Sequence, residues 1–177
     1  TLIFDSTNTF TGGLIINDGM AKYGPDGDLT NGPLVIWGDG VFDMSGKTDT
    51  LGAVTILTGF LTNSAELGEL TIGSLSLGGM PAGVPARVDT GSGMLKLGGT
   101  VTYASGNDPE TAVITGTLDL NGATRTFAVY NSVAAGTEID LDVPAAITGA
   151  AGYGIAKTQG GVLRLRGINT FDGALTI

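Results

Sequence analysis

The feature that most constrains the fold of this chain is an apolar pair that returns about every 20 residues. In each pair, two apolar residues flank a single residue, so both would lie on the same face of a β-strand. The pairs are Leu14/Ile16, Leu34/Ile36, Val54/Ile56, Leu75/Leu77, Leu95/Leu97, Leu118/Leu120 and Ile139/Leu141. Sandwiches and meanders turn about every 8–12 residues, whereas this longer period is typical of one coil of a β-solenoid. The sequence therefore predicts an all-β chain wound into roughly eight parallel coils of about 20–24 residues.

A second apolar series follows the first and predicts another strand in each coil. Its members are Val41, Leu61, Val84, Val101, Phe127 and Ile147. Short segments rich in Gly, Asn, Asp and Pro lie between the pairs, and these residues accept turns and positive φ at low cost. They predict the corners of the coils, with residues 79–89 and 104–110 bulging outward as insertions.

Composition agrees with a folded β protein and excludes several classes of function. Glycine supplies 31 of 177 residues, yet 42% of the chain is apolar, which is unlike a disordered sequence. The absence of Cys and His excludes disulfides, thiolate metal sites, Cys nucleophiles and imidazole bases. The net charge of -9 opposes binding to nucleic acid, and no apolar run reaches the ~20 residues of a membrane helix. We therefore expect neither a nucleic-acid partner nor membrane insertion by this segment.

The chain ends on the phrase with which it nearly begins. Asn8-Thr-Phe-Thr-Gly12 returns as Asn169-Thr-Phe-Asp-Gly173, close to the last residue. The motif predicts a turn at Asn, an inward-facing aromatic ring and a bend at Gly. Its matching residues are Asn8/Asn169, Phe10/Phe171 and Gly12/Gly173. This repeat, and a first residue that is not Met, predict that residues 1–177 form a single solenoid segment of a longer repetitive chain.

These residues resemble the autotransporter-associated β-strand repeat of very large bacterial surface proteins. Residues 161–177 carry a Leu-x-Leu strand, then Gly-x-Asn-Thr-Phe-x-Gly, then a short Thr/Ile strand, as that repeat does. Further stretches, similar to those that precede the repeat in the family, are 118–127, 145–149 and 154–158. One departure is Ser6, which stands where the second copy of the motif has Gly167.

The resemblance implies a right-handed parallel β-helix in an exported protein, serving as a stalk, fibre or adhesin. It implies neither catalysis nor a cofactor. The implied location is extracellular or on the bacterial cell surface. Partners would be further β-helix coils of the same or identical chains, with surface glycans and host or neighbouring cells as other candidates. We therefore expect a structural module rather than an enzyme.

A second hypothesis is a carbohydrate-active β-helix enzyme, either a polysaccharide lyase or a glycosidase. If the residue inside each apolar pair points outward, Asp119 and Asp140 lie on adjacent coils, with Glu138 and Asp142 beside them. Two close carboxylates can act as an acid and a base or can hold Ca²⁺. The simpler interpretation is a solvated strand face, because residues 138–143 alternate polar and apolar side chains.

Two arginines follow the acidic segment in the same alternating pattern. Arg164 and Arg166 come about one predicted coil length after Asp140 and Asp142. If the two strands are neighbours, each Arg would face an Asp, and the pairs would help to fix the register. The alternative is that this spacing leads to a different face of the coil.

A third hypothesis is an adhesin tip that binds a glycan or a protein. Trp37, the only tryptophan, would stack on a sugar if it is exposed, and the alternative is a packed corner residue. The loop 104–110 is the other candidate for such a surface. Asp26, Asp28 and Asp39 resemble fragments of calcium loops but lack the required spacing, so we interpret them as turn residues.

Overall fold

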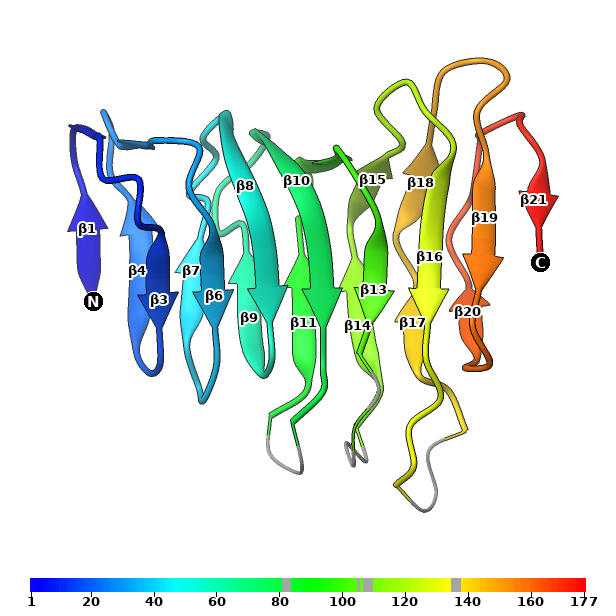
Figure 1. The fold of residues 1–177 in the computed structure, drawn as a ribbon. Helices are drawn as coiled ribbons and strands as arrows, with labels where there is room; N and C mark the ends of the chain where they lie inside the picture. The colour runs from blue at the N-terminus through cyan, green and yellow to red at the C-terminus, as the bar shows by residue number, and fades with distance from the viewer. Residues whose placement is uncertain (81–83, 105, 107–109, 135–137) are drawn as a thin grey trace.

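The chain winds into a stack of about eight coils in which the strands pair in parallel. The computed structural model describes residues 1–80, 84–104, 106, 110–134 and 138–177. Each regular element in these ranges is a β-strand, and the two termini lie at opposite ends of the stack (Figure 1). The strand pairing confirms the predicted parallel β-solenoid, whereas its right-handed winding stays a prediction.

The first face of the solenoid is an eight-stranded sheet to which every coil contributes one strand. We number the coils 1 to 8 by these strands, which are β1 (Leu2–Phe4), β4 (Met20–Tyr23), β7 (Val41–Asp43), β9 (Gly59–Thr62), β11 (Ala86–Asp89), β14 (Ala112–Thr115), β17 (Leu141–Val143) and β20 (Leu163–Leu165). Leu2 pairs with Ala21, which is a shorter step along the chain than predicted, whereas Ala112 pairs with Leu141, which is a longer one. Coil length therefore varies more widely than predicted.

The other two faces belong to one eleven-stranded sheet that forks at β10. The long strands β8 (Asp49–Ile56) and β10 (Glu69–Leu77) run along both faces and pair with each other. The first half of β10 then pairs with β12 (Met94–Leu97), on the second face of the solenoid. The second half pairs with β13 (Val101–Tyr103), on the third face.

Both branches of the fork continue towards the C-terminus. The second face goes on through β15 (Thr117–Asp119) and β18 (Ala146–Thr148). In coils 1 and 2 the second face consists of a separate two-stranded sheet, formed by β2 (Thr7–Asn8) and β5 (Asp28–Leu29). The third face comprises β3 (Leu14–Ile16) and β6 (Leu34–Ile36) before β8, and β16 (Arg125–Val129), β19 (Ile155–Thr158) and β21 (Leu175–Thr176) after β13.

A column of glycines lies where the second face bends into the third. Gly32, Gly52, Gly73 and Gly99 occupy this bend in successive coils. A Cβ on Gly73 would lie 3.2 Å from the carbonyl carbon of Gly52, and a Cβ on Gly99 would lie 2.3 Å from the carbonyl oxygen of Gly73. The backbones of adjacent coils approach too closely here to admit a side chain.

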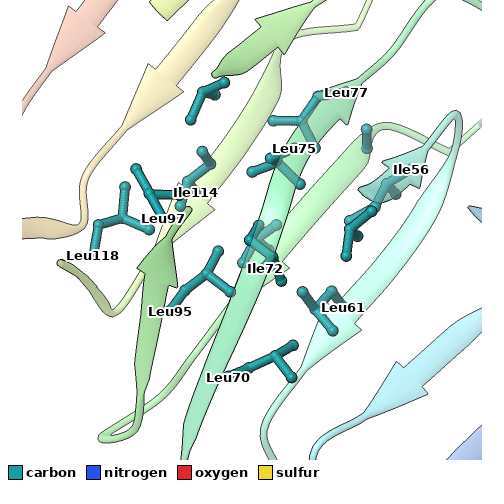
Figure 2. Packing of buried hydrophobic residues seen from close by; sticks show 14 of the residues in the cluster. Ile56, Leu61, Leu70, Ile72, Leu75, Leu77, Leu95, Leu97, Ile114 and Leu118 are labelled. Carbon is teal, nitrogen blue, oxygen red and sulfur yellow. The ribbon is translucent and has the colours of Figure 1, made fainter. Parts of the chain in front are cut away.

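The apolar core runs along the stack and receives side chains from all three faces. Figure 2 shows Leu61 of the first face, Leu70 and Leu95 of the second and Leu75 of the third gathered in one interior. Each of these residues is at most 1% exposed. Because a coil buries its apolar residues mainly against the coils on either side, stability is close to one-dimensional.

The predicted series of apolar pairs is correct for four coils and then changes face. Its correct members, which are register partners, are Leu14, Leu34, Val54 and Leu75. Leu75 then pairs with Val101 rather than with Leu95, which pairs instead with Leu70 in the other half of β10. The second and third faces carry the same apolar alternation, so spacing alone did not distinguish them.

The later predicted positions also divide between faces. Leu141 lies on the first face, in β17. In the second apolar series, Leu61 lies on the first face and Phe127 on the third. The segment 79–89, predicted as an insertion, contains β11, and residues 81–83 lie outside the described residues.

The longest coils carry their additional residues at one corner of the stack. The connections from β10 to β11 (78–85), from β13 to β14 (104–111) and from β16 to β17 (130–140) each lead from the third face to the first (Figure 1). An insertion at a corner leaves the strand ladders intact, which is how solenoids usually accommodate extra length.

Candidate functional site

The structure separates the two carboxylates that were predicted to be neighbours. Asp119 lies in β15 on the second face, where its register partner is Lys96. Asp140 directly precedes β17 on the first face. The two residues lie on adjacent coils, 6 and 7, but the prediction that they are neighbours on one face is wrong, because Leu118 and Leu141, which defined those positions, belong to different faces.

Asp140 is a buried structural carboxylate, not an outward one. It is 1% exposed, and its two oxygens accept hydrogen bonds from the backbone amides of Ser132 and Val162, each at 2.7 Å. The side chain thus ties the connection before β17 to the start of coil 8. A carboxylate enclosed in this way is unsuited to acid–base chemistry on a polysaccharide.

Asp142 holds two arginines of the next coil. Arg164 donates through Nε at 3.0 Å and Nη2 at 2.9 Å, and Arg166 donates through Nε at 3.0 Å and Nη2 at 2.5 Å. Asp142 is 3% exposed, whereas the two guanidinium groups remain about half exposed. The hydrogen bonds from Arg164 and Arg166 hold the pKa of Asp142 well below its usual range.

This arrangement confirms that the acidic and basic strands are neighbours, but it changes the predicted pairing. Arg164 is the register partner of Asp142, and Arg166 reaches the same carboxylate. The cluster of Arg164, Asp142 and Arg166 therefore carries one net positive charge across coils 7 and 8, in a chain that is acidic as a whole.

The remaining predicted carboxylates are held separately. Asp119 accepts hydrogen bonds from the backbone amide of Asn121 and the hydroxyl of Thr148. Glu138 is exposed. Across the described part of the chain, no group of three or more acidic side chains is arranged to hold a metal ion.

A pair of carboxylates that the sequence did not reveal lies on coils 2 and 3. Asp49 accepts hydrogen bonds from the Tyr23 hydroxyl and from the backbone amide of Leu29, the latter at 3.2 Å. Burial of the phenol and its bond to Asp49 raise the pKa of Tyr23. Loss of hydration and a hydrogen bond with Asp49 raise the pKa of Asp28. Asp28 belongs to β5, and its separation from Asp49 by about one predicted coil length was the available signal.

Asp43 is another carboxylate that accepts hydrogen bonds from a neighbouring coil. It is 3% exposed and accepts hydrogen bonds from the backbone amides of Ser45 and Ser64, each at 2.9 Å, and from the Ser64 hydroxyl at 2.5 Å. Burial raises the pKa of Asp43, but the hydrogen bonds from Ser64 and Ser45 outweigh burial and keep this pKa below its usual value. Asp43, Asp49 and Asp140 thus act as ties between successive coils.

The candidates for an adhesin surface have mixed outcomes. Trp37 is 40% exposed, and its indole N–H donates to the side-chain oxygen of Asn17 in the preceding coil. Trp37 is therefore an exposed residue whose indole N–H is bonded to the preceding coil. The loop 104–110 contains residues 105 and 107–109, which lie outside the described residues.

The two ends of the stack expose apolar side chains of the kind that interior coils bury. Leu2 is 52% exposed, whereas Leu61, in the same column three coils further on, is 1% exposed. The N-terminal end has a hollow of about 610 Å³ that Leu2, Leu14 and Ile16 help to line. The C-terminal end has one of about 470 Å³, lined by Leu163, Leu165, Leu175 and Ile177 among others.

The repeated motif occupies the same corner of the first and last coils, seven coil-to-coil steps apart. Asn169 accepts a hydrogen bond from the backbone amide of Ile147 in the preceding coil at 3.1 Å. Asn8 donates to the carbonyl oxygen of Ser6 at 2.6 Å and, at 3.5 Å, to that of Asp28 in the following coil. The same amide thus contacts the coil before it in one copy and the coil after it in the other.

The Phe and Gly of the motif differ between the two ends in the same way. Phe171 packs against the core, whereas Phe10 is 40% exposed. A Cβ on Gly173 would lie 2.2 Å from the carbonyl carbon of Tyr153 in the preceding coil. A Cβ on Gly12 would meet no described atom within 4 Å.

No protein-family model matches the chain, and no curated protein or solved structure matches it. The β-solenoid fold therefore rests on the strand register, and the resemblance to the autotransporter-associated repeat rests on the motif residues. Within the described residues, no helix is long and apolar enough to cross a membrane.

Proposed function

We propose that the chain is a structural segment of a bacterial cell-surface or extracellular stalk, fibre or adhesin, extended by further coils on its ends. The observation that carries the proposal is the state of the terminal coils. The outer edges of β1 and β20 lie at the two ends of the first-face sheet, and the core beneath them is open. Open strand edges and apolar ends are covered in a stable solenoid, because terminal coils otherwise cost solubility.

The interior of the stack supports a mechanical role. Coils of a parallel solenoid rise about 4.8 Å each, so eight coils give a rod of roughly 35–40 Å. The carboxylates of Asp43, Asp49 and Asp140 hold neighbouring coils together by hydrogen bonds to backbone or side-chain donors. Length and stiffness, rather than a reaction centre, are what such a segment supplies.

The location is tested by labelling intact cells that make the protein with antibodies raised against residues 1–177. We expect labelling without permeabilisation and loss of the signal after brief protease treatment of whole cells. An antibody against a cytoplasmic protein controls for lysis. Labelling that requires permeabilisation would overturn the proposal.

The two alternative functions gain no supporting observation. The carboxylates that motivated a carbohydrate-active enzyme lie on different faces, with Asp140 enclosed. Trp37 is bonded to the preceding coil, and the described residues form no aromatic strip around it.

A further inference from the structure

We infer that the third face of the interior coils binds ice, the ordered and uncharged lattice that water forms on freezing. The binding surface is the outward side of this face in coils 3 to 6. The inference goes beyond the proposed function and does not depend on it, because a β-solenoid can bind ice whether or not it stands on a cell surface.

Two straight columns of small side chains cover this surface. Six of its eight outward residues carry a hydroxyl, and the other two are alanines. The first column is Ala53, Ser74, Thr100 and Thr126, and the second is Thr55, Ser76, Thr102 and Ala128. We call these eight residues the hydroxyl face. All of them are partly or fully exposed, and the strands that carry them, β8, β10, β13 and β16, lie side by side (Figure 1).

The hydroxyls of this face are not used to hold the fold together. Within the described part of the chain, none of the six donates or accepts a hydrogen bond. Elsewhere, threonine hydroxyls tie neighbouring coils: Thr58 donates to the carbonyl oxygen of Gly38 at 2.9 Å, and Thr148 to that of Leu118 at 3.2 Å. The hydroxyl face therefore keeps its donors and acceptors available to what lies outside the protein.

Charged side chains are excluded from the hydroxyl face, although the chain has 17 acidic and 8 basic residues. The outward positions of the second face include the register partners Lys96 and Asp119, and those of the first face include Arg87 and Asp89. An ion gives up its hydration at a high cost, so it opposes close contact with an uncharged lattice. In coils 3 to 6, the third face thus presents hydroxyl and methyl groups without ions.

The hydroxyl face is regular, and its border towards the second face is low. Parallel ladders hold neighbouring strands about 4.8 Å apart and alternate residues of one strand about 6.6 Å apart, and the β-branched threonines are stiff at χ1. At the border, Gly73 and Gly99 have no side chain to rise above the surface. Arg125 turns its guanidinium to the carbonyl oxygens of Gly98 and Leu120, both at 2.7 Å.

This array matches an ice surface in chemistry and in spacing. Its groups repeat about every 4.8 Å along a column and lie about 6.6 Å apart across the columns, distances similar to those between water oxygens on faces of ice. Each hydroxyl donates and accepts hydrogen bonds, as a water molecule does. The threonine methyl groups restrict the orientation of the water next to them. Water between the two columns is therefore ordered before it meets the crystal.

Other partners fit the hydroxyl face less well. It has no aromatic ring on which a sugar would stack. It also lacks the aromatic and arginine side chains that dominate the binding energy of protein interfaces. Two copies packed face to face would bury many hydroxyls away from water, which is costly wherever one of them finds no partner. Ice requires free hydroxyls, methyl groups and a regular repeat, and the face supplies all three.

Partition into growing ice tests the inference on the whole chain. A dilute solution of the protein and of a reference protein that does not bind ice is frozen slowly onto a cold surface, and both proteins are measured in the ice and in the remaining liquid. The wild type should be enriched in the ice several-fold over the reference. Ser76→Lys, which places a charge within the hydroxyl face, should fall to the level of the reference. Ser76→Thr, which keeps the hydroxyl and adds a methyl group, should keep the enrichment.

Thr50→Lys is the matched control, because it adds the same charge to an outward position of the second face, beside Thr71. It should partition as the wild type does, and circular dichroism should show that all three variants are folded. Wild type that partitions no better than the reference would overturn the inference, as would equal partition of Ser76→Lys and Thr50→Lys.

A pelleting assay with crystalline cellulose and chitin distinguishes ice from a polysaccharide. Binding to either solid that Ser76→Lys abolishes, without enrichment of the wild type in ice, would assign the face to a polysaccharide and overturn the inference. Absence of pelleting together with enrichment in ice supports it. Labelling of intact cells is independent of these results, so either proposal can fail alone.

Discussion

The first and last coils carry the same motif but meet different neighbours, and the difference shows what the motif residues do. Gly173 and the side-chain oxygen of Asn169 both contact the coil before them. Gly12 has no preceding coil in this segment, and Asn8 bonds towards the coil that follows. At this corner, the preceding coil therefore decides whether a side chain is tolerated.

The same polarity holds at many interior corners, although a Cβ on Gly154 would instead meet the carbonyl oxygen of Ala174 in the following coil, at 2.0 Å. A Cβ on each of several corner glycines would collide with the backbone of the coil before it: these are Gly27, Gly38, Gly59, Gly68, Gly98, Gly161 and Gly167. At these seven corners, the backbone of the earlier coil leaves no room for a side chain.

The largest expected effect concerns how coil 8 is tied to the stack. Asp140→Ala should lower the free energy of unfolding by about 2–4 kcal/mol, because the amides of Ser132 and Val162 would both lose their acceptor. Asp5→Ala, on exposed coil 1, should change it by no more than about 0.5 kcal/mol. Urea denaturation of dilute protein measures both, and equal losses would remove the distinction between the two ends.

The glycine comparison should give the next largest effect. Gly173→Ala should cost about 1–3 kcal/mol because its Cβ overlaps the backbone of Tyr153. Gly12→Ala should be neutral, or stabilising by about 0.5 kcal/mol. Thermal unfolding compares the two, and a destabilised Gly12→Ala variant would contradict the assignment.

The Asp142 cluster predicts a dependence of stability on pH. Because the folded pKa of Asp142 lies below its unfolded value of about 3.9, its contribution is complete above that pH and is lost as pH falls towards the folded pKa. Asp142→Asn should therefore cost about 1–2 kcal/mol at pH 7 and progressively less below pH 4. Unfolding free energies measured from pH 3 to pH 7 test this, and a gap that widens in acid would be the wrong sign.

The smallest expected effect separates the two asparagines. Asn169→Ala should cost about 0.5–1.5 kcal/mol, because the amide of Ile147 loses its acceptor. Asn8→Ala should cost less, since its contact to the following coil is a long one of 3.5 Å. Hydrogen exchange at the Ile147 amide gives a local measure, with the Asn8 variant as the matched control.

The sequence predicted the parallel coils and most corners, because an apolar period of about one coil length has few other physical causes. It failed at Leu95, since two faces of each coil carry the same apolar alternation. The longer coils between β9 and β17 then moved later positions onto other faces. Insertions change the period without leaving a signal that identifies the face.

The candidate site was harder to predict than the fold. Asp140 matched an outward strand position, but its carboxylate is enclosed by two backbone amides. These bonds join Asp140 to residues in other segments of the chain, and alternation within one strand carries no information about them. The pairing of Arg164 and Arg166 near Asp142 was visible because the spacing approached one coil, although both arginines share one carboxylate.

The termini lie at opposite ends of the stack, so a pull on them acts along the hydrogen bonds between coils. Such a load opens the weakest interface first and leaves the next coil intact beneath it. The molecule should therefore lengthen under tension in small successive steps, each of which separates one coil from the next. Mechanical work is then dissipated over many steps, and the fold does not unfold at a single force.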